Sequence, residues 1–268
     1  MRKAIIPIIL AAVLIVPAIF SGCETTGPGK IGTEGNVITE EKDFTDFTYV
    51  DVGSAFEVEI TRSDSFSIII SADESLFDYV AVSKAEGTLK IYLNPRHIFT
   101  DFTLGAKTLK AEITMPNLYG LNLSGATNGT VTGFESSDDF KLDVSGASSL
   151  DMDDIEVGDA ELEVSGASRV SGNMTTDDAE FKVSGASSIE LSGSADNTII
   201  EVSGASRVDL ADFPLDDADV KLSGASEATV NVKGKLDTAL SGASRLYFYG
   251  NPTMGDTYVS GASTIKHK

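Results

Sequence analysis

The sequence contains no tryptophan, a single cysteine and only two histidines among its 268 residues. The lone Cys23 excludes an internal disulfide, and His97 and His267 alone argue against a histidine-centred triad or a histidine-rich metal site. Basic residues are also scarce, with 20 against 41 acidic ones, and the net charge of −21 makes nucleic acid an unfavourable partner. Aromatic residues reach only 7%, which favours a stack of small and β-branched side chains over an aromatic-centred core.

The first 22 residues have the composition of an export signal. Arg2 and Lys3 supply positive charge, residues 4–20 are uncharged and apolar, and Ser21 and Gly22 are the small residues expected before a cleavage point. An uncleaved membrane anchor is the weaker alternative, because the apolar run contains prolines and is short for a bilayer span of ~20 residues. We therefore expect residues 1–22 to be a lipoprotein signal peptide.

Cys23 follows this segment directly. The tetrapeptide Phe20-Ser21-Gly22-Cys23 resembles the bacterial lipobox, although phenylalanine stands where leucine is usual. The resemblance implies that Cys23 becomes the lipidated first residue of the mature chain. Residues 23–36 are rich in glycine and threonine and are expected to form a flexible tether. The folded part would then lie in the cell envelope, outside the cytoplasm and attached to a membrane.

A Ser-Gly-Ala motif recurs eight times, at intervals of 18 to 21 residues. A fixed period near twenty predicts a solenoid, in which each repeat is one coil that buries its apolar side by stacking on its neighbours. The eight motifs begin at Ser124, Ser145, Ser165, Ser184, Ser203, Ser223, Ser241 and Ser260.

Apolar and polar residues alternate on both sides of the motif. Leu142 and Val144 precede Ser145 with Asp143 between them, and Leu150 follows five residues after the serine. This period of two is typical of a strand with one buried face, and the lack of a 3.6-residue period after residue 121 excludes helical solenoids. We predict an all-β protein, a parallel β-helix or solenoid expected to be right-handed, with about eight regular coils of ~19–20 residues over 121–268.

The small residues of the motif have a packing reason. Neighbouring coils stack about 4.8 Å apart, so glycine permits backbone angles and close contacts that a larger residue would block. Alanine is expected to fill the remaining space, and the pattern leaves open whether the strand bends at the motif or runs through it. The serine hydroxyls are expected to bond to one another or to backbone groups. The alternative is a ligand surface for a polysaccharide at Ser145, Ser165, Ser184, Ser203 and Ser223.

Acidic residues recur six or seven positions before the motif in five coils, as in Asp138-Asp139 and Asp216-Asp217. Aspartate or asparagine at a turn accepts hydrogen bonds from turn amides, and this recurrence favours a structural role over a catalytic carboxylate pair, which is usually unique. Calcium is a further alternative, because stacked carboxylates repel and Ca²⁺ takes several oxygen ligands. The sequence lacks the Gly-Gly-x-Gly-x-Asp nonapeptide of calcium-binding β-rolls. The candidate calcium ligands are Asp139, Asp159, Asp178 and Asp217. No other cofactor is expected.

Arg207, Glu227 and Arg245 occupy one position in three consecutive coils, four residues after the motif's serine. Opposite charges at this spacing predict a surface ladder of ion pairs. An arginine set that binds an acidic glycan is the alternative, which Glu227 weakens because it would neutralise the patch.

Residues 37–120 are β-rich but less regular. The runs 56–60 and 66–70 are expected to be paired strands or two edges of an irregular coil, and 73–80 to form one or two helical turns. Residues 50–55 echo the later repeat in shifted form, so the solenoid is expected to begin here with degenerate coils that cap the stack. This favours one continuous domain, or two tightly joined β parts.

The spaced patterns of this part also resemble a known family. They are Phe47-x-x-Val50-x-Val52, Phe56-x-Val58, the strand at 66–71, Gly87-Thr88-Leu89-Lys90-Ile91 and the motif Leu121-Asn122-Leu123-Ser124-Gly125-Ala126. Together with the repeat, they are similar to the family of putative auto-transporter adhesins with a head GIN domain over residues 45–265, although the Gly-Ile-Asn tripeptide is absent. The resemblance implies a β-helical, exported, often lipid-anchored protein, and it brings no catalytic residues.

These observations favour binding over catalysis. The sequence has no P-loop, no Gly-x-Ser-x-Gly elbow and no dinucleotide fingerprint. We expect a lipid-anchored β-solenoid that binds or scaffolds an extracellular or envelope partner, a glycan or a protein. The alternatives are a polysaccharide-processing enzyme on a β-helix and a self-assembling structural protein of the envelope.

Overall fold

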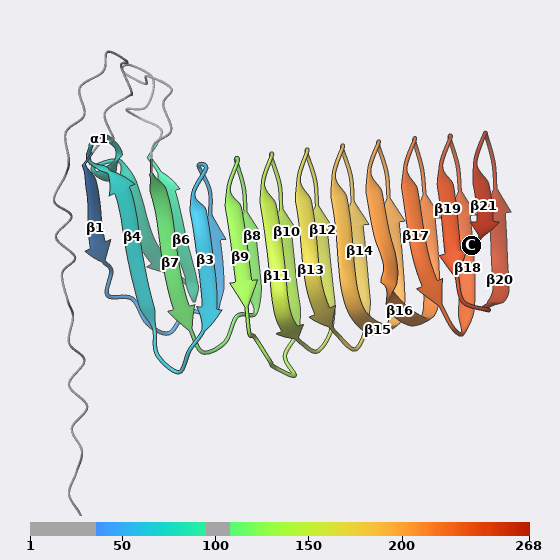
Figure 1. Cartoon of the computed structure of the whole chain (residues 1–268), viewed down its shortest axis with the longest axis horizontal. Coiled ribbons are helices and arrows are strands. Elements are labelled where there is room, and N and C mark those ends of the chain that lie inside the picture. The colour runs from blue at the N-terminus through green and yellow to red at the C-terminus, as the bar shows by residue number, and fades with distance from the viewer. Residues whose placement is uncertain (1–35, 95–107) are drawn as a thin grey trace, which may run out of the picture. The chain divides into compact units, whose positions relative to one another are not determined.

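The computed structural model describes residues 36–94 and 108–268, which belong to one compact unit (Figure 1). These residues form 21 strands and one short helix, and the parallel strand pairs repeat along the stack of coils. The predicted all-β parallel solenoid is therefore confirmed. The hand of the coil stays a prediction.

Each regular coil contributes one strand before the Ser-Gly-Ala motif and one strand after it. The strands before the motif pair side by side in a stack that we call sheet A. In spatial order sheet A contains β6 (Thr88–Leu93), β2 (Tyr49–Val52), β8 (Gly120–Leu123), β10 (Phe140–Val144), β12 (Ala160–Val164), β14 (Ala179–Val183), the second halves of β15 (Ser188–Val202) and β16 (Arg207–Leu222), β18 (Lys235–Leu240) and β20 (Thr253–Val259).

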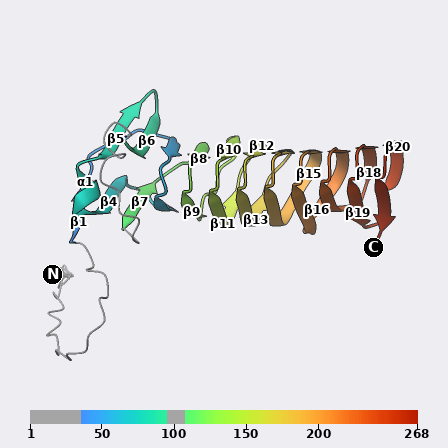
Figure 2. The same ribbon diagram turned by 90° about the horizontal axis from the view of Figure 1, so that it is seen from above.

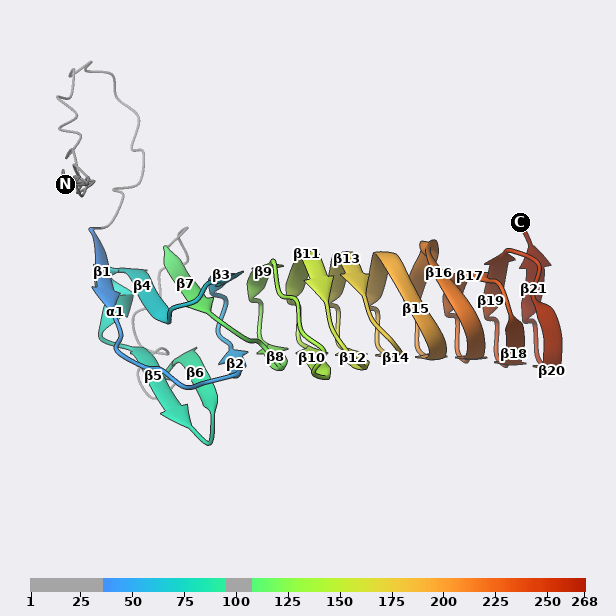
Figure 3. The same cartoon turned by 90° about the horizontal axis from the view of Figure 1, so that it is seen from below.

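The strands after the motif form a second stack, sheet B. In the same order it contains β7 (Leu109–Met115), β3 (Glu57–Arg62), β9 (Asn128–Thr132), β11 (Ser149–Glu156), β13 (Arg169–Thr175), the first halves of β15 and β16, β17 (Glu227–Val232), β19 (Arg245–Tyr249) and β21 (Thr264–His267). Figures 2 and 3 show the two stacks facing each other along the row of coils. Every coil is thus flattened, with the core between the two sheets.

The core consists of the columns that the alternating pattern predicted. Leu142, Val144 and Leu150 are each at most 1% exposed, and they lie in register with apolar residues of the next coil. Phe181 and Phe213 lie edge-on to each other inside the stack, with ring centroids 6.2 Å apart. Because each coil buries its apolar side only against its neighbours and the opposite sheet, these columns are the main source of stability.

The Ser-Gly-Ala motif forms the bend between sheet A and sheet B. Its glycines have φ between 71° and 79°, the left-handed region that favours glycine, so the strand bends and does not run through. In the bend of Gly146, the amide of Ala147 donates to the carbonyl of Gly125 in the preceding coil at 2.8 Å. Alanine was expected to fill the remaining space where the coils stack, whereas Ala147 and its equivalents are exposed at the apex of the bend.

The N-terminal part begins with a coil of the same geometry. The strands β2 and β3 pair in register with β8 and β9, and Ser54 and Ala55 take positive φ at the bend between them. This agrees with the degenerate first coil expected from the sequence. The helix predicted within 73–80 is present as α1 (Glu74–Phe77).

Antiparallel strands continue beyond this coil. The strand β4 (Ser67–Asp73) pairs with β7, β1 (Val37–Glu41) pairs with β4, and β5 (Val80–Ala85) pairs with β6, all antiparallel. The runs 56–60 and 66–70 were expected as paired strands, and this option is wrong because β7 lies between β3 and β4. The chain adds β6 and β7 on one side of the first coil and then continues with β8 and β9 on its other side.

Candidate functional site

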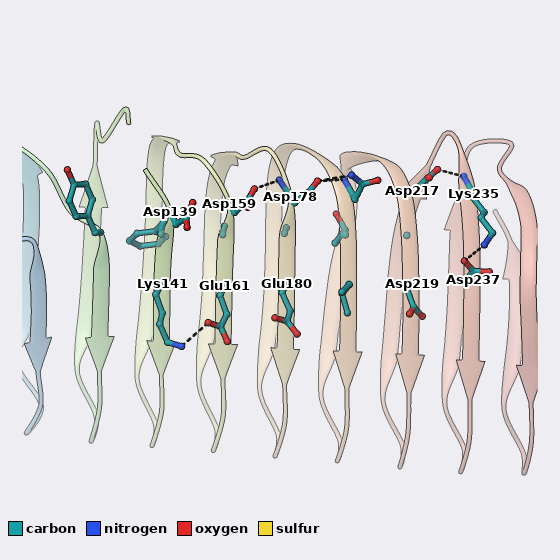
Figure 4. Close-up of a pocket in the computed structure, with 18 of the residues that line it drawn as sticks. Asp139, Lys141, Asp159, Glu161, Asp178, Glu180, Asp217, Asp219, Lys235 and Asp237 are labelled. Carbon is teal, nitrogen blue, oxygen red and sulfur yellow. Dashed lines mark hydrogen bonds and ion pairs between the residues drawn. The ribbon is translucent and has the colours of Figure 1, made fainter. Parts of the chain in front are cut away.

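A long groove runs along sheet A, near the margin where the chain enters each strand (Figure 4). Its lining residues come from or directly precede β2, β8, β10, β12, β14, β15, β16 and β18, and its volume is about 580 Å³. Residues two apart on a strand point to the same side, so the groove lies between two outward rows of side chains. The residues between the rows point inward and include Ala160, Ala179 and Ala218, which leaves mainly backbone as the floor.

The first row contains the four aspartates predicted from the recurring acidic positions. Asp139, Asp159, Asp178 and Asp217 are exposed and all line the groove, and Asn197 takes the equivalent place between the last two. We call these four residues the aspartate row. The four residues that the sequence pattern grouped therefore lie on one surface.

Hydrogen bonds between coils hold the carboxylates of this row. Oδ1 of Asp159 accepts from the backbone N–H of Asp178 at 3.2 Å, and Oδ1 of Asp178 accepts from the backbone N–H of Asn197 at 3.0 Å. Asp217 accepts in the same way from the N–H of Lys235 at 2.6 Å. Each of these carboxylates thus satisfies a backbone donor of the following coil, which is a structural role of the kind that the recurrence suggested.

The backbone at these positions differs from the predicted turn in two coils. Residues 138–139, 158–159 and 177–178 lie between strands, whereas 196–197 and 216–217 lie inside the long strands β15 and β16. Pairing between β15 and β16 instead shifts register earlier, between Glu190 and Ala195. The prediction of a turn in all five coils is therefore corrected: the two later coils change direction through this irregular pairing.

The geometry gives little support to a calcium site on the aspartate row. The described parts of the chain, 36–94 and 108–268, hold no group of three or more His, Cys, Asp or Glu residues placed to bind a metal ion. Ca²⁺ needs several oxygens converging at about 2.3–2.6 Å, whereas this row distributes its carboxylates over successive coils about 4.8 Å apart. Calcium binding at Asp139, Asp159, Asp178 and Asp217 stays an alternative that a melting experiment can decide.

The second row, which we call the outer row, consists of Lys141, Glu161, Glu180, Ile199, Asp219 and Asp237. Ion pairs neutralise most of it: Glu161 lies 2.8 Å from Lys141 and 3.0 Å from Lys182, and Asp237 lies 2.6 Å from Lys235. Hydrogen bonds from Lys141 and Lys182 lower the pKa of Glu161, and the bond from Lys235 lowers the pKa of Asp237. The sequence reasoning missed this row, because its pairing follows from register between coils.

Aromatic side chains mark one end of the groove. The ring of Tyr49 lies over Gly120, so close that a Cβ on Gly120 would overlap it. Tyr49 is 43% exposed, and Tyr119 beside it hydrogen-bonds to Asp138, which raises the pKa of the tyrosine. Farther along, Ile199 is a large apolar side chain that is 42% exposed within the outer row. The groove therefore combines carboxylates with exposed apolar surface.

The serines predicted as an alternative ligand surface lie at the other margin of sheet A. Ser184, Ser203 and Ser223 line a smaller hollow of about 470 Å³, together with Lys182 and Lys221. Ser145 and Ser165 do not line it, although they hold the same position in their coils. All five serines are half-buried, and their role in binding stays a prediction.

A second hydroxyl column was missed by the sequence reasoning. The residue after each Ser-Gly-Ala is serine or threonine, and it points into the bend. Ser226, for example, is fully buried, and its hydroxyl donates to the carbonyl of Ser223 at 2.8 Å. The signal was visible as an eightfold fourth position of the motif: Thr127, Ser148, Ser168, Ser187, Ser206, Ser226, Ser244 and Ser263. Thr127 and Ser244 donate to the bend carbonyl in the same way, so members of this column satisfy backbone groups of the bend.

On sheet B the predicted ladder of ion pairs is present. Glu227 lies 2.8 Å from Arg207 and 3.9 Å from Arg245, which flank it in the neighbouring coils. The glutamate side chain is 19% exposed and both arginines are largely exposed, so each pair contributes well under ~1 kcal/mol.

The sequence comparison decides the family. The sequence model of the family described as putative auto-transporter adhesin, head GIN domain, matches residues 46–252, which include the groove and seven of the eight motifs. The chain belongs to this family. A comparison with curated proteins finds no match.

Solved structures similar to this head GIN domain chain share its fold. A putative lipid binding protein from Parabacteroides distasonis superposes with a TM-score of 0.79 at 19% identity, covering 87% of this chain and 97% of its own. A putative adhesin from Parabacteroides merdae has a TM-score of 0.78 at 18% identity, covering 87% and 98%. A putative adhesin from Parabacteroides distasonis has a TM-score of 0.77 at 16% identity, covering 88% and 98%. At these identities the likeness establishes the fold alone.

Two residues singled out from the sequence of this head GIN domain chain, Cys23 and His97, lie outside the described residues. The expected signal peptide and tether lie there as well, except for Asn36. Within 36–94 and 108–268, no helix is long and apolar enough to cross a bilayer.

Proposed function

We propose that this head GIN domain protein is a lipid-anchored, adhesin-like β-solenoid of the cell envelope. It binds an extracellular or envelope partner through the groove face of sheet A, without catalysis. The observation that carries the proposal is that the groove repeats one arrangement over successive coils. A repeated surface suits extended, multivalent contact. The family and the adhesins with the same fold support a binding role.

The chemistry of the groove argues for binding without turnover. A catalytic pair of carboxylates needs two groups with distinct environments, one of them with a raised pKa. Here the aspartates of three coils repeat the same bond to a backbone N–H, and lysines lower the pKa of Glu161 and Asp237 in the facing row. The histidine of the described residues, His267, lies in β21 on the other sheet.

Lipid anchoring rests on the sequence around Cys23. A charged start, an apolar run and small residues before the cysteine are the parts of a lipoprotein signal, and residues 23–36 have the composition of a tether. The attachment would present the coils outside the cytoplasm. The net charge of −21 would also keep the coils away from anionic lipid surfaces, with the tether as the link.

The test begins with the anchor. The full-length protein is produced in a bacterial host that processes lipoproteins, with radiolabelled palmitate in the medium, next to the Cys23→Ala variant. We expect label and membrane association for the parent, and loss of both for Cys23→Ala. Label that persists in the variant, or an unlabelled parent, contradicts lipid anchoring.

The binding role has its own assay. Cells that carry the protein are compared with cells that lack it for attachment to immobilised glycans and envelope proteins, and exposure is checked by adding protease to intact cells. We expect protein-dependent attachment without any breakdown of the immobilised polymer. Release of shortened polysaccharide would replace the binding role by an enzymatic one.

A further inference from the structure

The aspartate row carries charge that the protein itself leaves without a counter-ion. Eight carboxylates and two lysines line the groove, which gives the lining a formal charge of −6. Lysines outside the lining neutralise carboxylates of the outer row: Lys182 forms ion pairs with Glu161 and Glu180, and Lys221 forms one with Asp219. Within the described residues, by contrast, Asp139, Asp159, Asp178 and Asp217 form no ion pair. The unneutralised charge of the groove is thus concentrated along one wall.

These carboxylates are also held in place. Asp159, Asp178 and Asp217 each use Oδ1 for a backbone N–H of the next coil, and their Oδ2 atoms have no hydrogen bond within the described parts of the chain. Backbone donors fix the orientation of a carboxylate without removing its negative charge. An incoming cation therefore meets acceptors that are already ordered, which reduces the entropy lost on binding.

Apolar and aromatic groups complete the groove. Tyr49 at one end and Ile199 in the outer row are exposed, and the floor between the rows runs past Ala160 and Ala179. Long basic side chains lay their aliphatic stems on such surface and keep the charged head at a polar wall, and an exposed tyrosine ring attracts cations.

From this geometry we infer that the groove binds an extended Lys- and Arg-rich segment of a protein partner, lying across the coils with its cationic heads on the aspartate row. The inference rests on the proposed binding function and names the chemistry of its partner. A linear oligocation places one charge on each carboxylate of the row, whereas a single metal ion needs several oxygens around one point. Opposite charge also steers such a segment toward a chain of net charge −21.

The natural sequence supplies a variant that keeps the fold. Asn197 already occupies the aspartate position in one coil, so asparagine is compatible with the row. The test variant combines Asp159→Asn, Asp178→Asn and Asp217→Asn, which removes three charges and retains an oxygen for each backbone N–H. The matched control combines Asp151→Asn, Asp153→Asn and Glu190→Gln, three exposed residues of sheet B, and changes the net charge by the same amount.

The experiment measures binding of fluorescein-labelled decalysine to full-length protein in detergent at low salt, by fluorescence anisotropy. Equal melting temperatures of the parent and both variants establish that all three are folded. We expect the groove variant to bind about tenfold more weakly than the parent, because it loses three surface ion pairs with the peptide. The sheet B control should bind like the parent. Added salt should weaken the parent most.

Three results would overturn the inference. They are unchanged decalysine binding by the groove variant, an equal loss in the sheet B control, and oligomers of glucosamine that bind the groove more tightly than decalysine does. The third would assign the groove to a cationic glycan. None of these results decides the proposed function, because the cell-attachment assay tests that function separately.

Discussion

Asn197 directs its backbone N–H and its side-chain amide to one carboxylate oxygen of the preceding coil. Its backbone nitrogen lies 3.0 Å and its Nδ2 lies 2.9 Å from Oδ1 of Asp178. A side chain in one coil thereby organises the backbone of the next, along the margin of sheet A where the groove lies. The carboxylate of Asp178 serves the fold through Oδ1, and its Oδ2 has no hydrogen bond within the described residues. Substitutions can therefore separate this structural role from the proposed binding role.

The first prediction uses this bond. Asp178→Ala leaves two donors of Asn197 without their acceptor, and we expect it to lower the free energy of unfolding by about 1 kcal/mol, because the site is exposed and water replaces part of the bond. Asp178→Asn keeps an acceptor oxygen and should cost little. Urea unfolding followed by circular dichroism provides both values. Equal losses in the two variants would mean that the charge of Asp178, and not its acceptor oxygen, stabilises the coil.

The bend glycines give the second prediction. Gly166 has φ +77°, and a methyl group there would overlap the carbonyl oxygen of Gly146 in the preceding coil. Gly87 has nearly the same φ, +76°, and no atom lies within 4 Å of the position that a Cβ would take, so Gly87→Ala measures the backbone strain alone. We expect about 1–2 kcal/mol of destabilisation for Gly87→Ala and clearly more for Gly166→Ala, up to failure to fold. Thermal melts of both proteins make the comparison, and similar losses would show that close stacking of the bends adds nothing to the requirement for glycine.

The coil interior was predictable because two periods coincide in the sequence. Leu142 and Val144 alternate with polar residues, and the pattern returns after about twenty residues, so both the buried face and the neighbour in the next coil follow. The position of β7 between β3 and β4 did not follow, because it depends on pairing between segments distant in the sequence, which no local pattern encodes.

The groove was likewise predictable only in part. The recurring spacing placed Asp159 and Asp178 on one surface, since residues at the same position of successive coils stack. The contact of Tyr49 with Gly120 depends on the register between β2 and β8, which the irregular N-terminal sequence does not reveal. The exposure of Ala147 was also unpredicted, because a small residue suits a crowded interior and a tight exposed bend equally well.

The third prediction concerns calcium. The aspartate row has no convergent set of oxygens for a single ion, so we expect the melting temperature of the protein to be the same in millimolar Ca²⁺ and in excess chelator. Binding of Ca²⁺ to the folded state would raise the melting temperature with concentration by mass action. A rise that disappears when Asp159, Asp178 and Asp217 are changed to asparagine would establish the calcium site.

The fourth prediction follows from the lowered pKa of Glu161. Its hydrogen bonds from Lys141 and Lys182 depress the pKa in the folded state below the usual 4.5, so the bonds stabilise the protein at neutral pH. Their contribution is lost as the pH falls through the depressed pKa, because the protonated carboxyl no longer attracts the lysines. We expect Glu161→Gln to be less stable than the parent at pH 7, by up to about 1 kcal/mol for two surface pairs, and the difference to vanish in strong acid. Urea unfolding at several pH values measures this, and a constant difference would contradict the ionic origin.

The fifth prediction separates the two hydroxyl columns of the bend. The hydroxyl of Ser226 is buried and donates to the carbonyl of Ser223, so Ser226→Ala leaves a polar group in the bend without its partner and should cost about 1–2 kcal/mol. The side chain of Ser223 itself is half-buried at the rim of the hollow and has no hydrogen bond within the described residues, so Ser223→Ala should be nearly neutral. Chemical unfolding of the two variants compares them directly. A neutral Ser223→Ala leaves the first column free for a ligand, which was the alternative reading of these serines in the sequence. A loss as large as that of Ser226→Ala would assign both columns to the fold, because each hydroxyl would then be needed to stack the coils.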